Sequence, residues 1–176
     1  MPVRVDNPIL LLRREHAEAL VMLDHLDAAL HDLTAPGASV AVEKAIAFLD
    51  EEVRAHNERE EESLFPALER YLPRSGPTAQ MRSEHREFWN LLSAFKAALR
   101  DKTLSPGGPR KQGLGVVNIL RNHIEKENQF LFPMAQQLLS AEEKAGVARK
   151  MEELIEARDH ASAEVTASSA CAEIGG

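Results

Sequence analysis

The sequence predicts an all-α protein, an antiparallel up-down-up-down four-helix bundle followed by a shorter C-terminal helix. Ala, Leu, Glu and Arg are abundant and favour helix, while β-branched residues show little of the clustering that strands need. Apolar residues recur at helical spacing in four long segments, and short loops containing Pro or Gly separate these segments. Because short loops make consecutive helices antiparallel neighbours, a bundle is the expected architecture.

Capping signals and chain breakers set the expected helix boundaries. Asn7-Pro8 combines an N-cap with a proline at the first helical position. Ser39 is expected to cap the second helix, and Ser140 forms a capping box with Glu143 at the start of the fifth. The expected helices cover residues 8–33, 39–71, 78–100, 110–139 and 141–160.

Size and composition exclude several classes of protein. The 176 residues suit one domain, so residues 1–160 are expected to form one unit and the Ala/Ser-rich residues 161–176 a disordered tail. A net charge of −7 argues against a nucleic acid or an anionic membrane as partner. The single cysteine, Cys171, allows neither a disulfide framework nor a thiolate metal cluster. No apolar run suits a membrane span or a signal peptide, so we expect a cytoplasmic protein.

A short motif occurs twice along the chain. His56 is followed four residues later by Glu60, and the same spacing returns at His123 and Glu127. A Leu-Phe-Pro sequence follows each copy at the same distance, ending at Pro66 and at Pro133. Residues four apart share one face of a helix, so each His and Glu are expected to point the same way. Each proline is expected to kink its helix.

The repeated pairs predict a metal site together with two lone histidines upstream of them, His16 and His85. In an antiparallel bundle all six side chains can point inward at one level. Four imidazoles and two carboxylates are too many for one tetrahedral zinc ion, and without thiolate they suit iron or manganese. If both carboxylates bridge, each of two ions has two histidines. Ferritin-like sites use Glu-x-x-His, and no histidine here has Glu three residues before it.

The pattern resembles the hemerythrin-like, His-His-Glu (HHE) cation-binding domain over about residues 8–140. The resemblance implies a four-helix bundle holding two non-haem iron ions, bridged by carboxylates and by an oxo or hydroxo group, with Mn or Zn as substitutes. It implies these metal ligands: His16, His56, Glu60, His85, His123 and Glu127. Oxygen carriers of the family have a further histidine at the position of Trp89, so we do not expect simple oxygen carriage. Members that repair iron–sulfur clusters carry an added Cys-containing N-terminal segment, whereas this chain is expected to start directly at the bundle, which weakens the case for that role.

The residues around these six are assigned by the helix faces on which they lie. Glu15 and Glu84 are expected at the surface, the alternative being that they orient a ligand imidazole. Trp89 is expected to pack in the core. Solvated faces are expected for Glu58, Arg59, Glu61, Glu62 and Lys126. The core is expected to contain Phe65, Phe88, Phe95, Phe130 and Phe132. The histidines expected not to be ligands are His25, His31 and His160.

Three functions are consistent with the sequence. The preferred one is a module that binds or senses O2, NO, H2O2 or iron itself, without nucleic acid or membrane as partner and with a homodimer as one arrangement of the chain. The alternative is an enzyme of the catalase or peroxidase type in oxidative or nitrosative stress defence. A third reading is a metal-free helical interaction domain. The residue pattern leaves any catalytic residue unknown.

Overall fold

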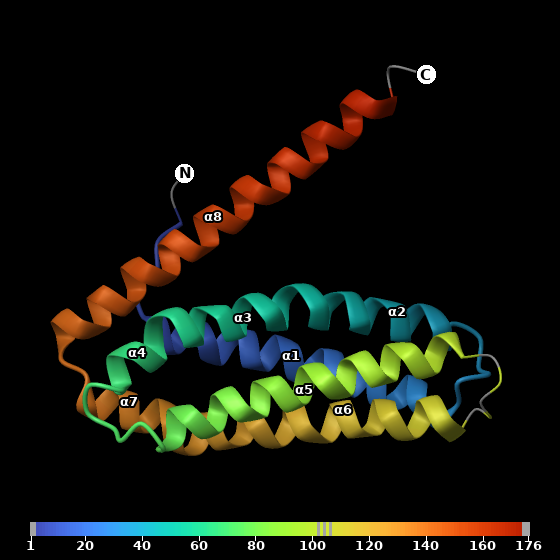
Figure 1. Ribbon diagram of the computed structural model, residues 1–176, viewed down its shortest axis with the longest axis horizontal. Helices are drawn as coiled ribbons and strands as arrows, with labels where there is room; N and C mark the ends of the chain where they lie inside the picture. The colour runs from blue at the N-terminus through green and yellow to red at the C-terminus, as the bar shows by residue number, and fades with distance from the viewer. Residues whose placement is uncertain (1–2, 102, 104, 106, 174–176) are drawn as a thin grey trace.

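The computed structural model describes residues 3–101, 103, 105 and 107–173, with side chains as far as residue 163. Every regular element in these ranges is helical, which confirms the predicted fold class (Figure 1). The elements are α1 (Pro8–His31), α2 (Ala38–Phe48), η1 (Leu49–Val53), α3 (Arg54–Arg59), η2 (Glu60–Leu64), α4 (Phe65–Leu68), α5 (Pro77–Arg100), α6 (Gly107–Lys126), η3 (Glu127–Leu131), α7 (Phe132–Leu138) and α8 (Ala141–Glu173).

Four long helical rods make up the bundle, because α2 to α4 form one rod and α6 to α7 another (Figure 1). The Asn7 side chain accepts a hydrogen bond from the Leu10 N–H, as an N-cap does. Ser140 and Glu143 exchange the two bonds of a capping box. The expectation for Ser39 was wrong. Gly37 is the N-cap of α2 because it adopts the left-handed conformation (φ 84°) that turns the chain into the helix.

The repeated motif carries a repeated change of helix type. η2 and η3 are π-helical, each begins at the glutamate of its motif, and each ends just before the Phe-Pro pair. In the first copy the Phe65 N–H donates to the Glu60 carbonyl five residues back, and the second copy does the same. Pro66 lacks an N–H and its ring would clash with the carbonyl four residues earlier. A π turn widens the helix just before each proline, at the position where a kink was expected.

Two hydrophobic clusters fill the bundle and leave a polar layer between them. The cluster nearer the α1–α2 loop includes Leu26, Leu30, Leu49, Phe95 and Val116. The cluster at the other end includes Leu12, Phe65, Met81, Phe132 and Met151. One phenylalanine departs from expectation, because Phe130 is 64% exposed on η3. The side chain of Phe130 points away from the bundle, whereas Phe132, two positions on, is buried.

The last helix, α8, crosses the end of the bundle at an angle and then projects away from it (Figure 1). Val147, Ala148 and Met151 anchor it in the second cluster. The helix continues to Glu173 and so passes the expected end near residue 160. Residues 161–173 of the expected disordered tail are helical in this structure, and alanine, which recurs in them, has the highest helix propensity. Residues 174–176 of that expected tail lie outside the described residues.

None of the described helices is both long enough and apolar enough to cross a membrane.

The close approach of α1, α5 and α6 depends on a glycine. A Cβ at Gly113 would lie 2.7 Å from both Leu30 methyl carbons and 2.9 Å from Phe95 Cε2. We expect Gly113→Ala to lower the free energy of unfolding by about 1–3 kcal/mol through overpacking, measured by urea denaturation. Gly115→Ala in the same helix is the control, because the nearest atom, Leu91 Cδ2, is 4.0 Å away. Equal changes in both variants would contradict the packing argument.

Candidate metal site

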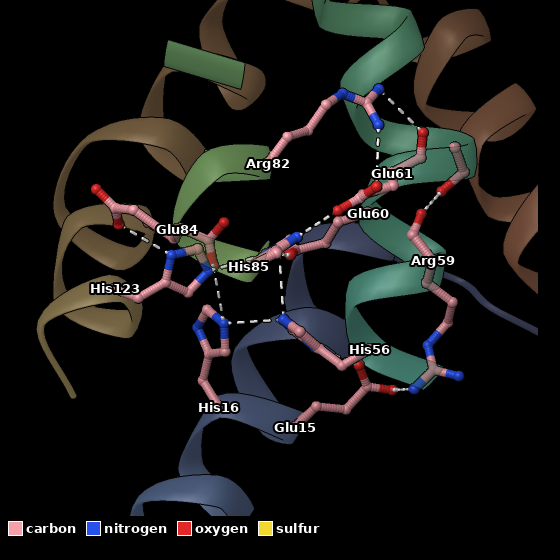
Figure 2. A network of polar contacts seen from close by, with 12 residues as sticks. Glu15, His16, His56, Arg59, Glu60, Glu61, Arg82, Glu84, His85 and His123 are labelled. Carbon is pink, nitrogen blue, oxygen red and sulfur yellow. Dashed lines mark hydrogen bonds and ion pairs between the residues drawn. The ribbon is translucent and has the colours of Figure 1, made fainter. Parts of the chain in front are cut away.

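Six side chains from four rods meet in the polar layer between the clusters (Figure 2). The bundle brings together all six residues that the sequence singled out, and their exposed fractions lie between 0 and 5%. They are His16 of α1, His56 of α3, Glu60 of η2, His85 of α5, His123 of α6 and Glu127 of η3. Each phenylalanine of the motif stacks on an imidazole, Phe132 on His16 at 5.1 Å and Phe65 on His85 at 5.9 Å.

The six residues form two overlapping sets of four that share both glutamates. We call the set with His16 and His56 position A, and the set with His85 and His123 position B. Glu60 spans the two, because its Oε1 lies 3.3 Å from His56 Nε2 and its Oε2 3.4 Å from His85 Nε2. Glu127 Oε2 lies 3.2 Å from Nε2 of both His16 and His123. Each carboxylate therefore contacts one histidine of each set.

Distances between the imidazole nitrogens fit coordination of one ion by each histidine pair. The two Nε2 atoms are 3.0 Å apart in position A and 3.1 Å apart in position B. Two nitrogen ligands about 2.1 Å from an ion and about 90° apart have this separation. When both imidazoles are neutral and protonated on Nδ1, their two Nε2 lone pairs face each other. A cation between the two nitrogens would accept both lone pairs.

Burial of the two glutamates, Glu60 and Glu127, is the costliest feature of the site. Both side chains are fully buried, and their four oxygens have no hydrogen-bond partner among the residues that the structure describes. Imidazole nitrogens lie 3.2–3.4 Å from three of these four oxygens, but they do not meet hydrogen-bond geometry. A buried carboxylate needs a cation or several donors to offset its desolvation. The donor set, nitrogen and carboxylate oxygen without sulfur, suits iron or manganese.

Similarity to known proteins agrees with this geometry. The Hemerythrin HHE cation binding domain matches residues 7–135, a range that contains all six residues. The chain belongs to this family. The iron–sulfur cluster repair protein YtfE of Cronobacter sakazakii is 32% identical over 108 residues, which is 57% of this chain and 49% of the relative. The YtfE proteins of Salmonella typhimurium and Salmonella paratyphi B are 31% identical over the same length. The chain thus spans about half the length of the curated relatives it matches.

Outward-facing Nδ1 atoms of the four histidines each have a partner in this HHE domain. In each half, the glutamate before the lone histidine contacts the motif histidine: Glu15 Oε2 is 2.8 Å from His56 Nδ1, and Glu84 Oε2 is 3.1 Å from His123 Nδ1. When Nδ1 carries the proton and donates to these oxygens, Nε2 presents its lone pair to the site. Glu15 and Glu84 therefore orient imidazoles, which was the alternative rather than the expected surface role.

The residue after each of Glu60 and Glu127 completes the outer contacts. Glu61 Oε1 lies 2.6 Å from His85 Nδ1, and Asn128 Oδ1 lies 3.2 Å from His16 Nδ1. Glu61 was expected on a solvated face, and Asn128 was not singled out at all. A signal was present in the sequence, because both residues follow a motif glutamate at the same offset. Helical periodicity alone did not show that Glu61 and Asn128 each face a histidine of a neighbouring rod.

Two cations hold the orienting glutamates in place. Arg59 Nη2 contacts Glu15 Oε1 at 2.7 Å, and Lys126 Nζ contacts Glu84 Oε1 at 2.6 Å. The Arg59 side chain is 7% exposed and that of Lys126 is 44% exposed. The expectation of a solvated face was therefore wrong for Arg59, which lies inside the structure beside a carboxylate.

The remaining candidates lie outside the site. The structure brings none of His25, His31 and His160 into either set of four. His31 is exposed at the end of α1, where its ring contacts the Asp27 carbonyl. Trp89 packs edge-on against Phe88, with the Arg54 guanidinium 4.1 Å from its ring centre. These contacts support the expected packing role of Trp89.

Buried carboxylates raise the pKa of the imidazoles that face them. Burial by itself lowers the pKa of His56, but Glu60 and Glu15 outweigh it and raise that pKa to about 10. Burial likewise opposes the charged form of His123, yet Glu127 and Glu84 raise its pKa to about 9. Without a metal ion, protons on imidazole offset the carboxylate charge. A bound metal would replace these protons.

One small pocket, with a cavity volume of about 20 Å³, lies between the surface and the site. Its buried lining includes His16, His56 and His123, and its exposed rim includes Glu18 and Glu52. The walls between them are largely apolar and include Phe48, Val53, Leu120 and Ile124. Its volume suits a ligand about the size of a water molecule at the imidazole edges.

The raised pKa values predict opposite pH trends for the metal-free and the metal-bound protein. Protonated His56 and His123 stabilise the metal-free fold fully below about pH 6.5, and this contribution is lost as the pH rises toward 9 to 10. Metal binding requires neutral imidazole. We therefore expect the rise in Tm on adding ferrous ion anaerobically to be larger at about pH 8 than at about pH 6, measured by calorimetry. An equal rise at both values would contradict this assignment.

The orienting role of Glu84 predicts weaker metal binding without it. We expect Glu84→Ala to lower metal affinity by about 10–100-fold, because His123 loses the acceptor that fixes its tautomer and ring orientation. Competition with a coloured chelator measures this affinity. The matched control is Glu87→Ala, an exposed position one turn further along α5. An affinity that is unchanged in Glu84→Ala, or lowered equally in the control, would refute the role.

Proposed function

We propose that this HHE protein is a non-haem diiron protein that binds or senses a small ligand, O2, NO or H2O2, or iron itself. The observation that carries the proposal is the burial of four carboxylate oxygens that lack hydrogen-bond partners in the described structure, amid four imidazole nitrogens. In the proposed site, both metal positions would share Glu60 and Glu127, and each iron ion would have two of the four histidines as ligands. Manganese or zinc could substitute with the same ligands.

The chain's own residues prepare this site before a metal arrives. The outer contacts of Glu15, Glu61, Glu84 and Asn128 fix each imidazole with Nε2 facing inward. The stacked phenylalanines close the site toward the second hydrophobic cluster and keep water from that side. Bound iron would supply open coordination positions and a change of oxidation state. The pocket above position A is where a small ligand would approach.

Iron–sulfur cluster repair is a second candidate, and the comparisons favour it. The matched relatives carry that name, although the chain spans only about half their length. In a repair role, iron itself would be one of the species that the site binds. A catalase or peroxidase activity remains the enzyme alternative. Rapid oxygen evolution from H2O2 would favour the enzyme, and reversible spectral change with O2 or NO would favour the binder.

Metal analysis tests the proposal directly. After anaerobic ferrous loading and desalting, we expect about two iron ions per chain by elemental analysis. Glu60→Ala should retain less than half of this content, because both positions share Glu60. Glu58→Ala is the control, since that residue is exposed on the same rod. A protein that takes up no iron, or a Glu60→Ala variant that retains both ions, would refute the proposed site.

A further inference from the structure

The two halves of the site are built alike except at one outer contact. Three of the four imidazoles have a carboxylate oxygen at Nδ1, supplied by Glu15, Glu61 and Glu84. The fourth, His16, has the amide oxygen of Asn128. Because Glu61 and Asn128 each follow a bridging glutamate, they are equivalent positions of the repeat with different charge.

This difference weakens the hold on a metal at position A. A carboxylate on Nδ1 makes an imidazole more basic and a better metal ligand, and charge-assisted hydrogen bonds are shorter and stronger than neutral ones. The contact at His85 is 2.6 Å and that at His16 is 3.2 Å. Position B therefore has two histidines supported by carboxylates, whereas position A has one.

Access from solvent differs in the same direction. The pocket is lined by both histidines of position A but by only His123 of position B. On the other side, Arg82 contacts Glu61 at 3.3 Å (Figure 2). Arg82 also lies 5.2 Å from the Phe65 ring centre, and Phe65 stacks on His85. An ion at position A would thus have fewer histidine ligands held by carboxylates, and it would lie closer to the pocket.

We propose that the two metal positions are unequal, that the ion at position A exchanges with solution first, and that Asn128 sets this difference as a positioning residue. The inference rests on the proposed two-metal site. It assigns the exchangeable ion to the position that faces the pocket, so an incoming ligand or chelator meets that ion first.

Iron release measures the inequality directly. Protein first shown to hold about two irons per chain is reduced anaerobically and mixed with excess ferrous chelator, and the coloured product is followed with time. We expect two phases of about one ion each, the faster at least about 10-fold faster, in line with the effect of an outer-contact carboxylate. Asn128→Asp should slow the fast phase toward the slow one. Arg13 supports this variant, because its guanidinium already contacts the residue 128 carbonyl at 3.0 Å.

Glu61→Gln is the matched variant at the equivalent position. It should speed the slow phase toward the fast one and leave the fast phase unchanged. Should Asn128→Asp not load iron, Glu61→Gln decides the question by itself. A general change in stability would alter both phases together, whereas the inference predicts one phase per variant. Release of both ions in one phase, or variants that release iron like the parent protein, would overturn the inference. Failure to load two irons at the start would instead overturn the proposed function and the inference with it.

Discussion

The structure depends on two glutamate side chains buried in the middle of a helical bundle, with no hydrogen-bond partner among the described residues. Carboxylates in such a place are strongly destabilising unless positive charge accompanies them. Here four imidazoles surround Glu60 and Glu127, and the pKa of His56 and of His123 is raised accordingly. The hydrophobic clusters on either side hold the four rods together, so the polar layer can serve binding rather than packing.

Duplication of one motif explains most of the site. Each copy supplies a histidine, a buried glutamate, a phenylalanine that stacks on an imidazole of the other half, and a proline preceded by a π turn. The π turn begins at the glutamate itself in both copies. Such turns often mark functional positions because the extra residue re-aims side chains against the helical repeat. The proline secures the turn by removing the N–H that an α-helix would need.

Departures from the repeat give the two halves different properties. α8 packs beside η2 and has no counterpart beside η3 in the described structure, where Phe130 is exposed. Arg59 is buried, while its counterpart Lys126 is half exposed. Glu61 and Asn128 differ in charge at equivalent positions. A symmetrical ligand set within asymmetrical surroundings is a physical basis for two metal positions with different affinities.

The sequence by itself determined the helical class, the four rods and the six convergent residues, because helical periodicity and a repeated His-x-x-x-Glu spacing are local signals. The tertiary structure decided what those six residues contact. Glu15 and Glu84 lie near the surface on their own helices, and only the neighbouring rod brings an imidazole to them. The same holds for Glu61 and Asn128. The exposure of Phe130 and the continuation of α8 also lay beyond local pattern, because they depend on which faces other elements cover. Contacts between helices depend on rotation and register, and one helix's periodicity specifies neither for its neighbour.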